Sequence, residues 1–414
     1  MAVLEILTKL SFVLFLGVIM GLIAKRVRLP PMLLLILSGV ILSNINVNGQ
    51  PFIQFTNDFL ISASILALVM IVFKDSSTFS LKDVDIYSES AAKIAVIFLV
   101  LNMLFLSVAV FSIFHIGNVL LSLLFAAVMS GTDPGAVLSL FQTKSNRVTD
   151  ILKFESVINT PIIVLIPFIL LDVMEIGEGI FTNFLGHFYP FLQQIITGIG
   201  TGVFVGIIVF RFMRRFYSER LSPLTLITSA LLTYIISENL GGNGVLAVTV
   251  LGVFFGNVTV KKKLELLEFS AMLSNTLEII VFVLIGFLLP LNLDLWFVVK
   301  SVLLFIIMIV LRFGAIQIVY ISDHINLKER IFMALNCTKG IAVAVVAFLV
   351  STYVLQIPTL QEGVKVLQEL PVISIPGSQT IIDLMVLFII YSIILSSIMA
   401  RFSQNFIRLK VEGD

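Results

Sequence analysis

Long apolar runs recur through almost the whole chain, and they restrict its fold more than any other feature of the sequence. A helix needs about 17–25 mainly apolar residues to cross a bilayer. We count thirteen candidate spans, several of them short, as is typical of helices buried among other helices. They are predicted at residues 6–24, 31–42, 58–73, 94–114, 119–141, 151–171, 191–210, 224–236, 245–260, 272–289, 297–319, 331–353 and 381–399. The chain is therefore predicted to be an all-α polytopic membrane protein.

The composition agrees with a bilayer protein and argues against several function classes. Hydrophobic residues make up 59% of the chain and charged residues only 12%, whereas soluble domains are nearer a quarter charged. The net charge of +1 argues against nucleic acid as a partner. The single cysteine, Cys337, excludes a disulfide framework, and the histidines form no ligand cluster. Without a Walker loop, GxGxxG or HExxH motif, we expect neither an enzyme nor a resident cofactor.

Basic residues alternate along the loops, and this alternation tests the number of spans. They should gather on the cytoplasmic side, and they follow the odd-numbered runs, with Lys365 as the exception. The residues concerned are Lys25, Arg26, Arg28, Lys74, Lys82, Lys144, Arg147, Arg211, Arg214, Arg215, Arg220, Lys261, Lys262, Lys263, Lys328, Arg330, Arg401, Arg408 and Lys410. The pattern predicts a multi-pass protein of the cell membrane with its N-terminus outside and its C-terminus in the cytoplasm.

Two similar segments suggest internal symmetry. Residues 131–137 (GTDPGAV) and 337–343 (CTKGIAV) each place Thr, a charged residue and Gly in mid-span, seven spans apart. An odd separation reverses their direction, as expected for two inverted six-helix repeats in which helices 5 and 12 are broken. The repeats would cover about 6–171 and 224–399, joined by a linking helix at about 191–210. We expect one membrane transporter domain over 1–414 with no soluble domain. Coincidence among small residues is the alternative.

Ionisable residues inside predicted spans are costly and are therefore functional candidates. Asp133 stands out because Pro134 disfavours helical backbone at the residue before it. The helix should unwind there and present a carboxylate together with backbone carbonyls such as that of Thr132, and oxygen atoms are the ligands that hard cations require. Irregular backbone at membrane depth persists only where it lines a cavity. An ordinary helix cap is the alternative interpretation.

The sixth span adds a polar stripe, and the eleventh span adds an arginine. Ser156, Asn159 and Thr160 place oxygens near one helix face, either as ligands or as contacts between helices. An unpaired arginine in lipid is improbable, so Arg312 is expected to form a structural ion pair with Glu155.

Three further charged positions have less specific interpretations. Lys339 would offset negative ends of broken helices. Glu278 lies in mid-span with no obvious partner, either as a neutral buried acid or as an extra proton carrier. Lys74 and its neighbours Asp75, Ser76 and Ser77 are expected at the membrane interface.

Together these residues resemble the monovalent cation/proton antiporters, in the branch that contains archaeal and bacterial sodium/proton antiporters and the eukaryotic exchangers. The resemblance rests on Thr132-Asp133-Pro134, on Glu155-Ser156-x-x-Asn159-x-Pro161, on Arg312 and on Lys339-Gly340. It implies a homodimer in which each protomer has a dimerisation domain and a mobile six-helix core. It also implies cation coordination by Asp133, the Thr132 carbonyl and Ser156.

The chain departs from this family at informative positions. The family normally has an aspartate after the asparagine of span six, where this chain has Thr160. Many relatives have an acid where this chain has Lys74, and the break in span twelve usually has Arg where this chain has Lys339. Our leading hypothesis is a secondary antiporter that exchanges Na⁺ or K⁺ for H⁺, with Asp133 as the carrier. A cation channel that has lost proton coupling and a non-transporting regulatory homologue are the alternatives.

Overall fold

The structure is a computed structural model, and it describes most of the chain. The described residues are 2–27, 29–47, 50–51, 55, 57–79, 86–133, 147–176, 184–216, 218, 221–288, 294–321, 325–354, 376–402 and 406. Apart from a short hairpin, in which the two-residue strand β1 (Asn46–Val47) pairs antiparallel with the two-residue strand β2 (Gln50–Pro51), all regular structure in these ranges is helical.

The helices follow the predicted apolar runs closely. The first half of the chain contains α1 (Ala2–Val27), α2 (Pro31–Ser43), α3 (Asn57–Ser77), α4 (Ile86–Leu101), the π-helix η2 (Asn102–Leu106), α5 (Ser107–Phe114), α6 (Val119–Val128), α8 (Arg147–Ile176) and α9 (Phe184–Arg215). The second half contains α10 (Leu221–Asn239), α11 (Gly244–Asn257), α12 (Lys263–Phe287), α13 (Leu295–Val319), α14 (Leu327–Leu335), α15 (Ile341–Val354) and α16 (Ser378–Arg401).

Their length and composition are those of a multi-pass membrane protein. Within the described ranges, nine helices are long and apolar enough to cross a bilayer. Shorter apolar helices accompany them at Pro31–Ser43, Val119–Val128, Gly244–Asn257 and Ile341–Ser351. The prediction of an all-α polytopic membrane protein is therefore confirmed. The total of thirteen spans and the inverted repeats remain predictions.

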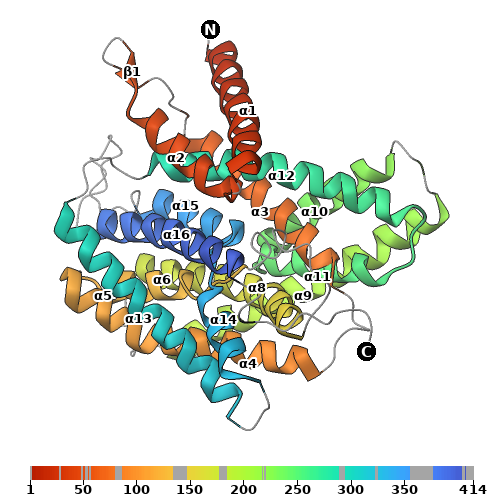
Figure 1. The fold of residues 1–414 in the computed structure, drawn as a ribbon. Coiled ribbons are helices and arrows are strands. Elements are labelled where there is room, and N and C mark those ends of the chain that lie inside the picture. The colour runs from red at the N-terminus through yellow and green to blue at the C-terminus, as the bar shows by residue number, and fades with distance from the viewer. Residues whose placement is uncertain are drawn as a thin grey trace, which may run out of the picture.

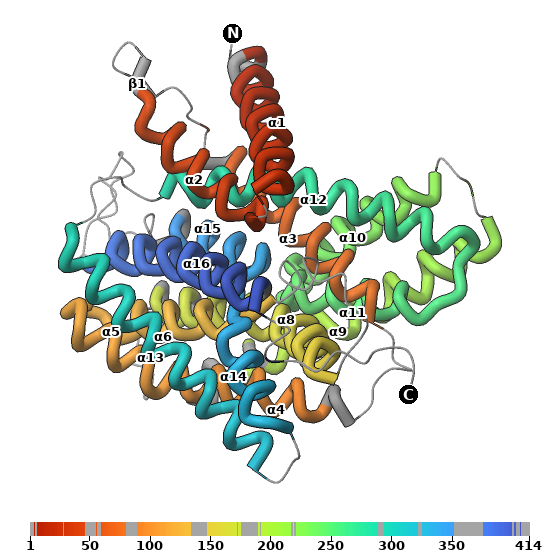
Figure 2. Tube along the Cα trace, viewed as in Figure 1, coloured from red at the N-terminus to blue at the C-terminus, as the bar shows by residue number. Residues whose placement is uncertain are grey.

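The helices pack as two groups that share a long seam (Figure 1). We call α4–η2–α5, α6, α8, α13, α14, α15 and α16 the core bundle, because these helices pack on one another. The helix α15 lies at the edge of this bundle and packs equally on helices of the second group. We call α1, α2, α3, α9, α10, α11 and α12 the frame bundle for the same reason. The bundles meet where α15 lies against α3 and α12 and where α8 lies against α11. Figure 2 shows that the core bundle combines both halves of the chain, since α15 and α16 lie beside α6.

Small residues let helices of the frame bundle approach closely. Lipid tails are as apolar as leucine, so packing contacts drive helix association in a bilayer, and glycine allows backbones to come together. At the crossing of α2 and α12, a Cβ added to Gly39 would stand 3.0 Å from the Cα of Gly286. The two backbones therefore touch, which holds the helices of the frame bundle at a fixed crossing.

The two segments in which helix breaks were predicted both lie in the core bundle. The helix α6 ends at Val128, and residues 131–133 are not helical. Pro134 and the residues up to 146 lie outside the described residues, so the prediction for 134–141 is untested. The second break separates α14 from α15 at residues 336–340. Irregular backbone in the middle of a transmembrane region frees polar groups, and the contacts of these groups define the candidate site.

Candidate functional site

The two broken segments cross and are joined by their backbones. The backbone N–H of Asp133 donates to the carbonyl of Thr338 at 2.8 Å, which connects the first break to the second. Thr132 and Thr338 are buried, whereas Asp133 is only half-buried. The crossing therefore leaves the Asp133 carboxylate partly accessible, while the two threonines beside it are enclosed.

A buried ion pair lies behind this crossing. Arg312 on α13 contacts Glu155 on α8 through two parallel hydrogen bonds, of 2.7 Å from Nη1 to Oε1 and 3.0 Å from Nη2 to Oε2. Both side chains have no exposed surface. The Arg312 guanidinium also lies 5.2 Å from the centre of the Phe98 ring. Bidentate geometry of this kind is what makes a buried pair tolerable.

Glu155 also connects the ion pair to the first break. The hydroxyl of Thr132 donates to Glu155 Oε1 at 3.0 Å. On the next turn of α8, Asn159 donates through Nδ2 to the carbonyl of Ser130 at 3.1 Å. The Asn159 Oδ1 atom is buried and has no hydrogen-bond partner. The face of α8 that carries Glu155 and Asn159 thus holds residues 130–132 in place.

The Lys339 side chain occupies the end of the broken helix α6. Its Nζ donates to the carbonyls of Met129 at 2.5 Å and Gly131 at 2.9 Å. These carbonyls follow the last turn of α6, where they lack intrahelical partners and where the helix dipole places partial negative charge. Lys339 is fully buried, and the ammonium group therefore compensates the carbonyls as the sequence suggested.

Three further charged residues from the frame bundle lie near Asp133 across the seam. Lys74 and Asp75 on α3 and Glu278 on α12 all interact electrostatically with one another, and Asp75 and Glu278 interact with Asp133. We call these four residues the seam cluster. A hydrogen bond of 3.1 Å from Ser274 to the carbonyl of Met70 joins α12 to α3 close by. Glu278 is half-buried and has charged neighbours, although none was obvious from the sequence.

The predicted interfacial position of the end of α3 is wrong in part. Ser76 and Ser77 are buried, with 2% and 3% of their surface exposed. The side chains of Lys74 and Asp75 retain 29% and 39% exposure and form an ion pair of 3.7 Å. The reason is that α11 packs on this end of α3, so closely that a Cβ at Gly252 would stand 2.8 Å from the carbonyl of Phe73.

Two further predicted ligands, Ser156 and Thr160, lie on α8. Ser156 and Thr160 are half-buried, and the Thr160 hydroxyl donates to the Ser156 carbonyl at 2.8 Å. The Thr160 hydrogen is therefore used within the helix, and its oxygen lone pairs remain. Among the described residues, no group of three His, Cys, Asp or Glu side chains is arranged to hold a metal ion.

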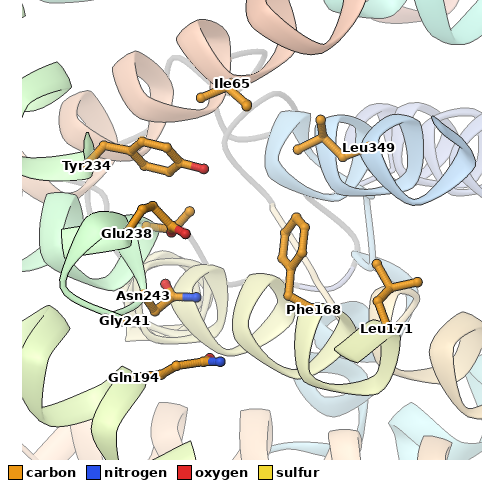
Figure 3. A pocket seen from close by; sticks show the side chains of 11 residues that line it. Ile65, Phe168, Leu171, Gln194, Tyr234, Glu238, Gly241, Asn243 and Leu349 are labelled. Carbon is orange, nitrogen blue, oxygen red and sulfur yellow. The ribbon is translucent and has the colours of Figure 1, made fainter. Parts of the chain in front are cut away.

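A separate cavity of about 320 Å³ opens on the same seam, on the side predicted to be outside (Figure 3). Tyr234 and Glu238 on α10 face it from the frame bundle, and Phe168 and Leu171 on α8 face it from the core bundle. The other lining residues are Ile65, Gln194, Gly241, Gly242, Asn243, Val245 and Leu349. Glu238 accepts a hydrogen bond of 2.7 Å from the N–H of Gly244, so this carboxylate also caps the start of α11.

The fold and the site define a multi-pass membrane protein with two crossed, charged helix breaks at the seam between two bundles. The family described as "Sodium/hydrogen exchanger, transmembrane" matches residues 11–402, and the chain belongs to this family. The resemblance drawn from the motifs is thus confirmed at the level of the family.

Individual relatives and a solved structure agree with this assignment. A probable Na⁺/H⁺ antiporter 2 from Methanocaldococcus jannaschii is 25% identical, over 83% of this chain and 84% of its own. A K⁺/H⁺ antiporter, NhaP, from Alkalimonas amylolytica is 28% identical, over 67% of this chain but only 48% of its own. The structure of the sodium proton antiporter MjNhaP1 from M. jannaschii at pH 8 has the same fold, with a TM-score of 0.78 at 19% identity over 96% of this chain and 99% of that one.

Proposed function

We propose that the chain exchanges a monovalent cation, Na⁺ or K⁺, for H⁺ by alternating access. The observation that carries this proposal is the position of Asp133, a half-buried carboxylate on a broken helix at the seam between two bundles. A carboxylate in a partly desolvated cavity can bind either a proton or a cation near neutral pH. If the two ligands compete for one carboxylate that crosses only when occupied, obligatory exchange follows.

Electrostatics supports a cation at this position. The seam cluster contains three carboxyl groups and one ammonium group, which sum to a formal charge of minus two when all four are ionised. The cations Arg312 and Lys339 lie behind Asp133, where Glu155 and backbone carbonyls satisfy them. These two positive groups are therefore already paired, and the negative charge of the seam cluster is left to attract a cation.

The neutral ligands would come from α8 and from the first break. Ser156 and Thr160 are half-buried oxygens on α8, and the carbonyl of Thr132 adjoins Asp133 in the chain. Asn159 is buried and donates through Nδ2 to the Thr132 hydroxyl at 3.4 Å. We assign cation binding to Asp133, Thr132, Ser156 and Thr160, and a supporting role to Asn159.

The structure suggests which side of the pathway is closed. The helices α3, α8 and α15 carry or adjoin the site, and they also line the cavity through Ile65, Phe168 and Leu349. Between the two levels these helices present buried valines, namely Val69, Val164 and Val345, each at most 1% exposed. We infer that this apolar layer closes the outer side and that the site is reached past Lys74 and Asp75. Transport would move the core bundle against the frame bundle.

The proposal also includes the setting of the protein. The basic loops favour the cell membrane with the N-terminus outside and the C-terminus in the cytoplasm. A homodimer held together through the frame bundle, which would leave the core bundle free to move, follows from the family resemblance. Cations, protons and the surrounding lipid would be its partners.

Proteoliposomes test the proposal directly. Purified protein is reconstituted with a pH-sensitive dye inside, and Na⁺, K⁺ and Li⁺ gradients are imposed in parallel. Exchange predicts proton movement driven by a cation gradient and cation movement driven by a pH gradient. A cation current without proton movement would instead identify a channel, and the absence of both would identify a non-transporting homologue.

A further inference from the structure

The second broken helix holds Asp133 at two points. Its backbone N–H donates to the Thr338 carbonyl at 2.8 Å. Its side chain lies against Gly340, two residues further along the same break. Gly340 immediately precedes α15, and its carbonyl accepts the first helical hydrogen bond, from Ala344 at 3.0 Å. The carboxylate of Asp133 is therefore packed directly on the start of α15.

No side chain fits at position 340. A Cβ built on Gly340 would stand 2.6 Å from the Cγ of Asp133 and closer still to the Cβ and Oδ2 atoms of the same side chain. Carbon atoms normally approach to about 3.5–4.0 Å. All three of the nearest atoms belong to Asp133, so a methyl group at this position would have to displace the carboxylate or the α15 start by about 1 Å.

Space, and not backbone conformation, accounts for the glycine. The φ angle of Gly340 lies outside the left-handed region, in contrast to Gly241 at +71° and Gly377 at +90°. An alanine could adopt the backbone conformation of residue 340. The methyl group of an alanine would instead overlap the Asp133 side chain.

We propose that Gly340 is a positioning residue that seats the Asp133 carboxylate against the second broken helix. This inference rests on the proposed function, in which Asp133 binds the cation. Because the seat and the carboxylate belong to the same bundle, Asp133 stays in register with the break as the bundle moves. Two separately broken helices thus fix one ligand, the first by carrying it and the second by leaving room for it.

The test compares three glycine-to-alanine variants in the exchange assay. Gly340→Ala should raise the KM for the transported cation on the order of tenfold, because a displacement of about 1 Å is costly at a coordination site. Gly314→Ala on α13 has no atom within 4 Å of the added Cβ, and it should match the wild type. Gly202→Ala on α9 crowds the carbonyl of Ala247 and the side chain of Val250 on α11, neither of which belongs to the proposed site, and it should lower the melting temperature without changing the KM.

A stability cycle keeps the proposal testable even if Gly340→Ala transports nothing. Gly340→Ala should lower the melting temperature of the otherwise wild-type protein. In an Asp133→Gly background, where the overlapping atoms are gone, Gly340→Ala should leave the melting temperature unchanged. An equal decrease of the melting temperature in both backgrounds, or a wild-type KM in Gly340→Ala, would overturn the proposal. Wild-type protein without exchange would contradict the proposed function instead and leave the stability cycle readable.

Discussion

Arg312 and Glu155 form a bidentate ion pair, with contacts of 2.7 and 3.0 Å, from which solvent is completely excluded. The two residues are 157 positions apart and come from α13 and α8. Since Glu155 also accepts the hydroxyl hydrogen of Thr132, the pair connects the packing of the core bundle to the segment that carries Asp133.

Replacing one residue of this ion pair should destabilise the protein more than replacing both. Either Glu155→Gln or Arg312→Gln leaves a buried charge unpaired, which should destabilise the protein by roughly 3–5 kcal/mol. The double variant should recover part of that loss, as measured by thermal unfolding in detergent. The exposed pair of Glu89 and Lys93 on α4 is the matched control, and Lys93→Gln should leave the melting temperature unchanged. If the losses of stability in the two single variants simply add in the double variant, Glu155 and Arg312 are not energetically coupled.

Glu278 should tune cation binding without being required for it. Its carboxyl group interacts electrostatically with Asp133 from the frame bundle, and removing one negative charge should weaken cation affinity roughly fivefold. The measurement is the KM for cation in Glu278→Gln proteoliposomes. Glu268→Gln, on an exposed position of the same helix, should have no effect. Complete loss of exchange in Glu278→Gln would make Glu278 the principal carrier.

Restoring the family acid should strengthen the site. Thr160→Asp adds a carboxylate on α8 beside Asn159, and it should lower the KM for cation by roughly fivefold through added negative charge. Thr160→Val, which keeps the shape and removes the oxygen, is the comparison variant and should raise the KM. A KM that is the same in all three proteins would show that position 160 is not part of the site.

Cysteine labelling should establish the orientation. The native Cys337 is buried, so a Cys337→Ser background removes a site that labels poorly in any case. A cysteine at Leu240, which is exposed next to the Gly241–Gly244 loop, should react with an impermeant reagent added outside intact cells. A cysteine at Lys261 should react only after the cells are opened. The reverse result at both positions would invert the topology.

The helices and the ion pair could be predicted because each depends on a local or strongly constrained signal. Apolar runs identify spans directly, and a buried Arg312 needs a carboxylate, for which Glu155 was the natural choice. The unwinding at Asp133 follows from Pro134. These inferences need no knowledge of how distant helices are arranged.

The seam cluster could not be predicted in the same way. Lys74 and Asp75 come from α3 and Glu278 from α12, about 200 residues away. Their proximity depends on how the helices pack, which cannot be read from one sequence. The end of α3 was expected at the interface because charges end an apolar run, yet α11 covers Ser76 and Ser77. The role of Gly340 was equally hidden, since a glycine in a helix break has several explanations until its neighbours are known.

Exchange by the Asp133→Asn variant tests whether Asp133 is the carboxylate that carries the cation and the proton. Asparagine keeps the shape of the side chain and removes the titratable charge, so the variant should fold and assemble like the wild type. With one carrier carboxylate, wild-type exchange should be electroneutral and insensitive to an imposed membrane potential. The decisive measurement is cation-driven proton flux in proteoliposomes containing wild-type protein or Asp133→Asn, with Glu265→Gln, on an exposed turn of α12, as the control. Normal flux is expected in the wild type and the control, and none in Asp133→Asn. Undiminished flux in Asp133→Asn would rule out Asp133 as the carrier.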